Sequence, residues 1–152
     1  MIRIYTDGGS RIRNRETPIA SCSAVILRDG TEEVIKQAFT DCTNNEMELM
    51  GVLMGLGEVY PTDETVEIYS DSAYIVNCFK DRWYDKWRIN NWTASNGKPV
   101  KNQKFWKILL DYYEVMDIEF IKVKGHSGDV GNEMADKAVN EAMDELEKHL
   151  KN

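Results

Sequence analysis

The sequence lacks the features of secreted, disulfide-stapled and membrane-spanning chains. Its 152 residues include three cysteines, Cys22, Cys42 and Cys78, which are odd in number and lack CxxC spacing. We expect them to pack as small apolar residues in a reducing compartment, the cytoplasm. The N-terminus has no basic stretch followed by an apolar core, and no apolar run approaches the ~20 residues of a membrane helix. The length favours one domain over residues 1–152.

An excess of positive charge is also missing, since the net charge is −7. That value alone argues against a nucleic-acid partner, which usually requires a basic surface. The charges are unevenly distributed, however. Residues 80–107 carry eight basic and two acidic side chains, whereas residues 29–67 carry ten acids and one lysine, and a smaller basic cluster is formed by Arg11, Arg13 and Arg15. Such basic regions leave nucleic acid open as a partner.

Hydrophobic periodicity predicts an α/β domain, a mixed sheet with helices on its faces. The predicted strands are Ile2–Asp7, Ala20–Arg28, Glu32–Thr40, Thr65–Ser70 and Ile118–Lys124. The predicted helices run from Thr43 to Tyr60, Ser72 to Phe79, Arg82 to Trp92, Lys101 to Met116 and Asn132 to Lys148. Thr43 and Glu46 have the spacing of a capping box.

Two of these strands end alike, as Ile-Tyr-Thr-Asp7 and Ile-Tyr-Ser-Asp71. The carboxyl edge of an open α/β sheet is where binding sites form, and neighbouring strands would bring both carboxylates to one place there. Like charges at short range are costly unless a positive charge lies between them. Either aspartate alone could equally be a turn or helix cap, but the matched pair favours a site.

A third carboxylate, Glu48, lies at the margin of the apolar face of its helix, one turn before Val52. We expect it to point inward over the sheet. Gly51 and Gly55 lie on the same side, and glycines there predict a close approach of helix and sheet. Glu46 has a sufficient explanation as the capping-box acid.

A fourth carboxylate, Asp136, follows a glycine-rich loop that contains His126, one of only two histidines. Asp136 alone would be an ordinary helix acid. Together, four oxygen donors without cysteine or paired-histidine ligands suit a hard cation such as Mg²⁺ or Mn²⁺. Two such ions ~4 Å apart would clamp the attacking and leaving oxygens of a phosphodiester.

The sequence resembles type 1 ribonuclease H of the bacterial kind. Five stretches carry the resemblance, in family order and across nearly the whole chain: TDGGS at Thr6–Ser10, TNNEMELM at Thr43–Met50, YSDSAYIV at Tyr69–Val76, GKPVKNQKFW at Gly97–Trp106 and VKGHSGDVGNEMADKAV at Val123–Val139. TDGGS or SDS alone is weakly specific, whereas the five together at family spacing are highly specific.

The resemblance implies a ribonuclease H-like fold, a five-stranded mixed sheet in the order 3-2-1-4-5 whose first three strands are antiparallel, flanked by helices. It implies endonucleolytic cleavage of the RNA strand of RNA–DNA hybrids with two Mg²⁺ ions. We expect the protein to be a monomer. The family's acidic quartet falls on Asp7, Glu48, Asp71 and Asp136, and its loop histidine, which resembles a proton shuttle or product-release aid, falls on His126.

Substrate contacts are implied as well. Thr43, Asn44 and Asn45 resemble the family's contacts to phosphate and the minor groove, where 2′-hydroxyl groups report RNA, while Asn132 and Glu133 match polar positions beside the site. The stretch from Lys80 to Trp92 is similar to a basic protrusion that grips the DNA strand. Its expected contacts are Lys86 and Arg88 to phosphates and Trp83, Trp87 and Trp92 to sugars, although at least one tryptophan could equally belong to the core.

The chain departs from the family pattern at two positions. An arginine-rich segment, Arg11–Arg15, replaces the usual glycine- and proline-rich turn, and Asn14 is the candidate for its substrate-side asparagine. Ala73 stands where many relatives have a glutamine that reads the hybrid. Some RNA-strand contact is therefore expected to be missing or supplied by the arginine segment.

Three other classes of protein fit part of the pattern. A junction resolvase or integrase shares the acidic cluster but not the TNNEMEL and VKGHSGD contexts. A non-enzymatic hybrid-binding module would be expected to have a broken acidic quartet. A detached reverse-transcriptase domain often lacks the basic protrusion.

Overall fold

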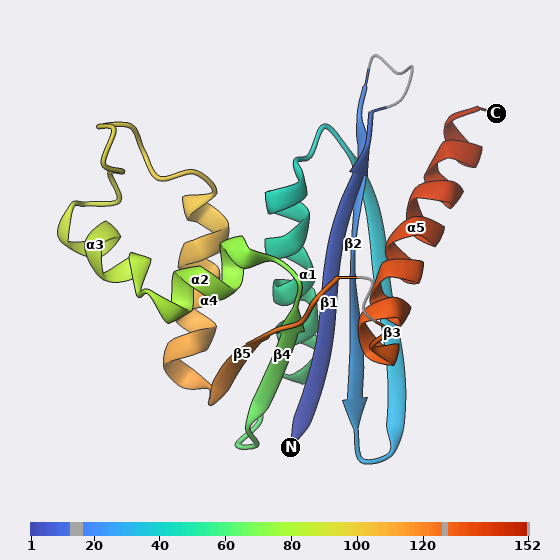
Figure 1. Ribbon diagram of the computed structural model, residues 1–152, viewed down its shortest axis with the longest axis horizontal. Coiled ribbons are helices and arrows are strands. Elements are labelled where there is room, and N and C mark those ends of the chain that lie inside the picture. The colour runs from blue at the N-terminus through green and yellow to red at the C-terminus, as the bar shows by residue number, and fades with distance from the viewer. Residues whose placement is uncertain (13–16, 126–127, 152) are drawn as a thin grey trace.

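A five-stranded mixed sheet in the order β3-β2-β1-β4-β5 forms the centre of the computed structural model, which describes residues 1–12, 17–125 and 128–151 (Figure 1). The strands are β1 (Ile2–Arg11), β2 (Ile19–Arg28), β3 (Thr31–Thr40), β4 (Val66–Ser70) and β5 (Ile118–Lys122). The first three are antiparallel, and β4 and β5 run parallel to β1. The implied strand order and pairing are confirmed.

Five helices of the described part of the chain flank the sheet. They are α1 (Asn44–Val59), α2 (Ala73–Lys80), α3 (Trp83–Ile89), α4 (Gln103–Val115) and α5 (Val130–Leu150). Within the described residues, no helix is long and apolar enough to cross a membrane.

Helices α1 and α5 cover opposite faces of the sheet, because alternate residues of β1 point to opposite sides. An added Cβ at Gly55 of α1 would lie 2.8 Å from Ile4, whereas one at Gly131 of α5 would lie 2.4 Å from the ring of Tyr5. The α1 face is the main core, where Ile2, Ile4 and Ile68 are fully buried under α1, α2 and α4.

Helix α1 begins with the predicted capping box. The Thr43 hydroxyl accepts a hydrogen bond from the Glu46 N–H, and the Glu46 carboxylate accepts one from the Thr43 N–H. The predicted close approach is also present, since a Cβ at Gly51 would lie 2.9 Å from the Ser23 carbonyl oxygen. The capped end and the small glycines together fix α1, and with it Glu48, against β1.

Several predicted boundaries are wrong. Strand β1 continues from Asp7 to Arg11, because it stays paired with β2 after its pairing with β4 has ended. Helix α5 begins at Val130 rather than Asn132, because the Asp129 side chain accepts a hydrogen bond from the Asn132 N–H and caps the helix earlier. The predicted helix from Arg82 to Trp92 is shorter, since α3 ends at Ile89 and Trp92 has a positive φ of 60°.

Candidate active site

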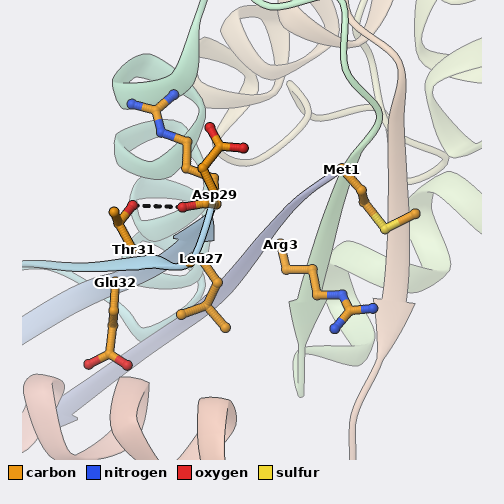
Figure 2. Close-up of a pocket in the computed structure, with 8 residues that line it drawn as sticks. Met1, Arg3, Leu27, Asp29, Thr31 and Glu32 are labelled. Atoms are coloured by element: carbon orange, nitrogen blue, oxygen red, sulfur yellow. Dashed lines mark hydrogen bonds between the residues drawn. The ribbon is translucent and has the colours of Figure 1, made fainter.

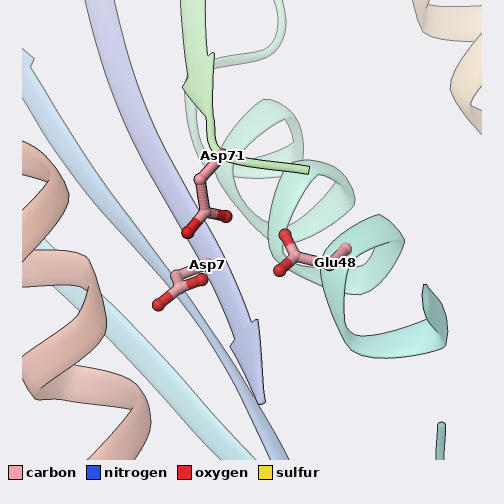
Figure 3. A group of neighbouring side chains, drawn as sticks. All are labelled: Asp7, Glu48 and Asp71. Carbon is pink, nitrogen blue, oxygen red and sulfur yellow. The ribbon is translucent and has the colours of Figure 1, made fainter. Parts of the chain in front are cut away.

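Three of the four predicted carboxylates meet where β1 and β4 separate. The pairing of these strands ends at Tyr5 and Tyr69, and Asp7 and Asp71 each follow two residues later. Glu48 reaches the same place from α1 (Figure 3). One carboxylate oxygen from each of the three lies within 4.8 Å of the others.

The inward orientation expected of Glu48 is confirmed. Its side chain is buried, and its Oε2 atom has no hydrogen-bond partner among the described residues. A buried carboxylate oxygen without a partner is costly in an apolar interior. A bound cation would remove that cost, and three carboxylates form the oxygen-only ligand set that Mg²⁺ and Mn²⁺ prefer. The residues therefore fit a hard divalent cation.

The pKa values of the buried carboxylates reflect the same cost of burying negative charge. Burial, followed by the charge of Asp71, raises the pKa of Asp7 to about 7. Burial and the charges of Asp7 and Asp71 raise the pKa of Glu48 to about 9. A hydrogen bond from the Gly8 N–H partly offsets both shifts. Without a cation, the site holds its negative charges only at a cost in folding free energy.

Asp136 lies beside this cluster rather than within it. It is half-buried on α5, and both its charge and a side-chain hydrogen bond contribute to the raised pKa of Asp7. The three-carboxylate group does not include it. Asp136 thus approaches the site through Asp7, from the helix on the other side of the sheet from α1.

Two glycines allow the surrounding backbone to close on the carboxylates. A Cβ at Gly8 would lie 2.6 Å from the backbone nitrogen of Glu48, so β1 and α1 touch at this point. A Cβ at Gly125 would lie 3.2 Å from Oδ2 of Asp71, so the segment after β5 passes directly beside that carboxylate. Larger side chains at these positions would displace the groups that carry the negative charge.

The predicted polar contacts at the start of α1 are available to a ligand. Thr43, Asn44 and Asn45 are exposed, a few residues before Glu48. Asn132 is different, because only 3% of it is exposed. Glu133 beside it is exposed. The two polar positions on α5 therefore offer very unequal access to substrate.

The basic region forms a lobe of α3, the following loop and the start of α4, and this basic lobe packs against the main core. Trp83, Trp87 and Trp92 are half-buried and pack against the main core, with the ring centroids of Trp87 and the buried Trp106 5.5 Å apart. A hollow of about 260 Å³ beside them is lined by Trp83, Lys86, Trp87, Asn90, Thr93, Ala94 and Ser95. Trp83 and Trp87 thus both pack against the core and line an open hollow, whereas Trp92 packs against the core without lining the hollow.

The basic side chains differ in whether they form ion pairs within the protein. Lys86 is exposed beside the hollow, whereas the Arg88 guanidinium forms an ion pair with Glu114 at 2.8 Å. Arg11 is likewise engaged, because it contacts Asp144 at 2.7 Å and Glu147 at 3.3 Å on α5. Arg11 therefore anchors the end of β1. His126 and Asn14 lie outside the described residues.

Another hollow lies at the far end of the sheet from these carboxylates. It has a volume of about 390 Å³ and is lined by residues at the β2–β3 turn and the start of β1, among them Met1, Arg3, Leu27, Asp29, Thr31 and Glu32 (Figure 2). Within it, the Thr31 hydroxyl donates a hydrogen bond to the Arg28 carbonyl oxygen at 2.7 Å. The hollow lies at the N-terminal end of β1, away from Asp7.

The sequence did not predict that two tyrosines, each two residues before one of the aspartates, stack on each other across β1 and β4. Tyr5 and Tyr69 stack with their ring centroids 4.5 Å apart and their planes 14° from parallel. Their repeated place, two residues before each aspartate, was the available signal, since it puts tyrosine and aspartate on the same face of the sheet.

The chain is similar to proteins already named as ribonucleases H. It matches the RNase H family over residues 1–144. It is 42% identical to the Ribonuclease H of Clostridium botulinum over 143 residues, which are 94% of this chain and 95% of that protein. It is 38% identical to the Ribonuclease H of Thermoanaerobacter sp. over 93% of this chain and 88% of that protein. The crystal structure of LC11-RNase H1 in complex with RNA/DNA hybrid is 25% identical, with a TM-score of 0.68 over 96% of this chain and 99% of that chain.

Proposed function

The chain belongs to the ribonuclease H family, and from that premise we propose that it hydrolyses the RNA strand of RNA–DNA hybrids with divalent metal ions held by its acidic cluster. The observation that carries the proposal is the group of Asp7, Glu48 and Asp71, whose carboxylate oxygens lie within 4.8 Å of one another. The solved relative LC11-RNase H1 was crystallised with an RNA/DNA hybrid, which supports the substrate class.

The proposed cofactor is a pair of Mg²⁺ ions, with Mn²⁺ as the alternative. Asp7, Glu48 and Asp71 would hold them, together with Asp136, and the orphaned Glu48 Oε2 is a ready ligand atom. When bound, such ions neutralise charge on a phosphodiester and lower the pKa of water. The two ions, the fourth ligand and the metal identity are all part of the proposal.

The protein's own contribution is to hold these groups in place before the substrate arrives. Burial of Asp7 and Glu48 excludes water and places their charges where they act most strongly. The close contact of Gly8 with the Glu48 backbone keeps that carboxylate over β1. The absence of a side chain at Gly125 allows the segment after β5 to pass beside the Asp71 carboxylate.

Substrate would lie across the start of α1 and the basic lobe. Thr43, Asn44 and Asn45 are exposed at a helix N-terminus, where backbone N–H groups and the helix dipole favour phosphate. In the lobe, Lys86 would contact phosphates, and the half-buried tryptophans beside the hollow would contact sugars.

Four further assignments stay within this proposal. His126 would assist proton transfer or product release, Asn14 would contact the substrate, and Asn132 would support the site from α5. Arg88 would contact phosphate only by exchanging its ion pair with Glu114. We also propose a single-domain monomer, which light scattering would test, and a cytoplasmic location, with which three free cysteines are compatible.

The test is a cleavage assay on end-labelled RNA–DNA hybrid, double-stranded RNA and double-stranded DNA, each with millimolar Mg²⁺ and with EDTA. We expect cleavage of the hybrid alone, and only with Mg²⁺. Equal cleavage of double-stranded DNA would instead favour a resolvase-like enzyme. Tight hybrid binding without cleavage in either Mg²⁺ or Mn²⁺ would favour a binding module.

A further inference from the structure

The first turn of α5 lies directly on the ring of Tyr5. A Cβ at Gly131 would come within 2.4 Å of two ring carbons and 2.6 Å of a third, so only glycine fits at this position. Asp129, which caps the helix, lies beside the Tyr5 hydroxyl, and its charge is, after burial, the second cause that raises the pKa of Tyr5. The start of α5 therefore takes its position from this side chain.

Tyr5 is itself held from its other side. It stacks on Tyr69, whose hydroxyl donates a hydrogen bond of 2.8 Å to Glu67, and Glu67 contacts Arg3 at 3.4 Å. Tyr5 and Tyr69 form the last paired position of β1 and β4 before the two aspartates. The stack thus spans the two strands at the point where they begin to separate.

Two sets of contacts hold α5 around Asp136. The Ser23 hydroxyl donates a hydrogen bond of 2.7 Å to the carbonyl oxygen of Ala135, directly before Asp136, and the Ser21 hydroxyl donates one of 2.6 Å to that of Val139, three residues after it. Towards the N-terminus, five residues or ~7.5 Å along the helix, the contact is that of Gly131 with Tyr5. The serines fix α5 to β2, and Tyr5 fixes the end that would otherwise be free to tilt.

We propose that Tyr5, held by its stack on Tyr69, is a positioning residue that sets the first turn of α5 and thereby the approach of Asp136 to Asp7. This inference rests on the proposed function, in which Asp136 completes the metal site. Tyr5 is not among the residues proposed to hold the metal or to contact the substrate, and it acts through α5. A displacement of a catalytic group by about 1 Å can lower the rate on the order of a hundredfold. A shift of the first turn of α5 that moves Asp136 by this distance would therefore be measurable as a loss of activity.

The test uses two variants that disturb this contact from opposite sides. Gly131→Ala adds a methyl group against the ring, and Tyr5→Val removes the ring while keeping a residue suited to a strand. Each is expected to lower kcat on hybrid roughly tenfold or more, with KM within about twofold of the parent because neither residue is in the proposed substrate path. Each is also expected to reduce the Mg²⁺-induced rise in Tm, measured without substrate.

Two controls separate positioning from general damage. Gly57→Ala is also a helical glycine substitution, but its nearest contact is Tyr112 at 3.5 Å, an ordinary distance, and it should behave as the parent. Tyr5→Phe keeps the ring and should retain most of the rate. In the double variant Tyr5→Val/Gly131→Ala, the added methyl group occupies space vacated by the ring, so kcat should exceed that of Gly131→Ala alone.

The results distinguish the two proposals. A parent that does not cleave hybrid would refute the proposed function, whereas the Mg²⁺-induced change in Tm still tests the role of Tyr5. Parental kcat and an unchanged Mg²⁺ response in Tyr5→Val would overturn the inference, even if Gly131→Ala fails to fold. A change confined to KM, or a loss in Gly57→Ala equal to that in Gly131→Ala, would also overturn it.

Discussion

Replacing Asp7 by asparagine should stabilise the metal-free protein while abolishing its activity. The substitution keeps the shape of the side chain and removes one of the negative charges that crowd the site. Burial and Asp71 raise the pKa of Asp7 from 3.8 to about 7. Above pH 7, the ionised aspartate therefore costs the folded state up to ~4 kcal/mol, at 1.36 kcal/mol for each pKa unit.

The gain in the variant will be smaller than this limit, because Glu48 and Asp71 share the repulsion and adjust their own protonation. We expect Asp7→Asn to exceed the parent by ~1–2 kcal/mol at pH 8 in EDTA, a rise in Tm of about 3–6 °C for a chain of this size. The gain should grow between pH 4 and pH 7 and then level off. In that interval, the parent's Asp7 is increasingly ionised in the unfolded chain but still resists ionisation when folded.

Added Mg²⁺ should reverse the order of stability. Binding stabilises the folded parent by RT ln(1 + [L]/Kd), and Asp7→Asn has lost a ligand. The assay is a pair of thermal melts, in EDTA and in millimolar Mg²⁺, beside hybrid cleavage. If Asp7→Asn were markedly less stable than the parent in EDTA, or cleaved hybrid near the parent rate, Asp7 would be a structural residue and not a metal ligand.

Three other expectations follow from the same structure. In EDTA, the parent should lose stability as the pH rises from about 4 to about 9, because the folded-state pKa values of Asp7 and Glu48 are raised to about 7 and about 9; a flat pH profile in urea denaturation would contradict this. Lys86→Ala should raise KM several-fold. It should also reduce the slope of log affinity against log salt concentration by about one, the effect of losing one phosphate contact. Arg88→Ala should change KM less, because Arg88 is paired with Glu114; equal KM values at every salt concentration would count against that difference. Gly51→Ala should destabilise the fold by ~1–3 kcal/mol through overpacking against β2, and unfolding at the parent's urea midpoint would refute the close contact.

The parts of the site that depend on local pattern could be predicted from the sequence. The repeated Tyr-x-Asp endings correctly indicated that Asp7 and Asp71 would meet. The glycines at i+3 and i+7 from Glu48 correctly indicated a helix close to the sheet. Both inferences rest on fixed periodicities, two residues in a strand and 3.6 in a helix.

The parts that depend on pairing between distant segments could not be predicted in this way. The sequence predicts that β1 ends at Asp7, whereas the strand continues to Arg11. Its pairing with β4 ends at Tyr5 but its pairing with β2 continues, and the local sequence does not distinguish the two cases. Asp136 owes its place beside Asp7 to contacts of α5 with Tyr5 and Ser23, far apart in the sequence. The engagement of Arg88 by Glu114, 26 residues away, is of the same kind.

The central claim is that the buried carboxylates hold metal ions that cleave the RNA strand of a hybrid. Its most direct test is a Mg²⁺ titration with one hybrid whose RNA and DNA strands carry different labels, cleaved by the parent and by Glu48→Gln. Glutamine preserves the size of the side chain and removes the charge of the orphaned carboxylate. We expect the parent to shorten only the RNA strand, in proportion to metal occupancy, and Glu48→Gln to lose nearly all cleavage. Cleavage of the DNA strand, cleavage in EDTA, or parental activity in Glu48→Gln would contradict the account.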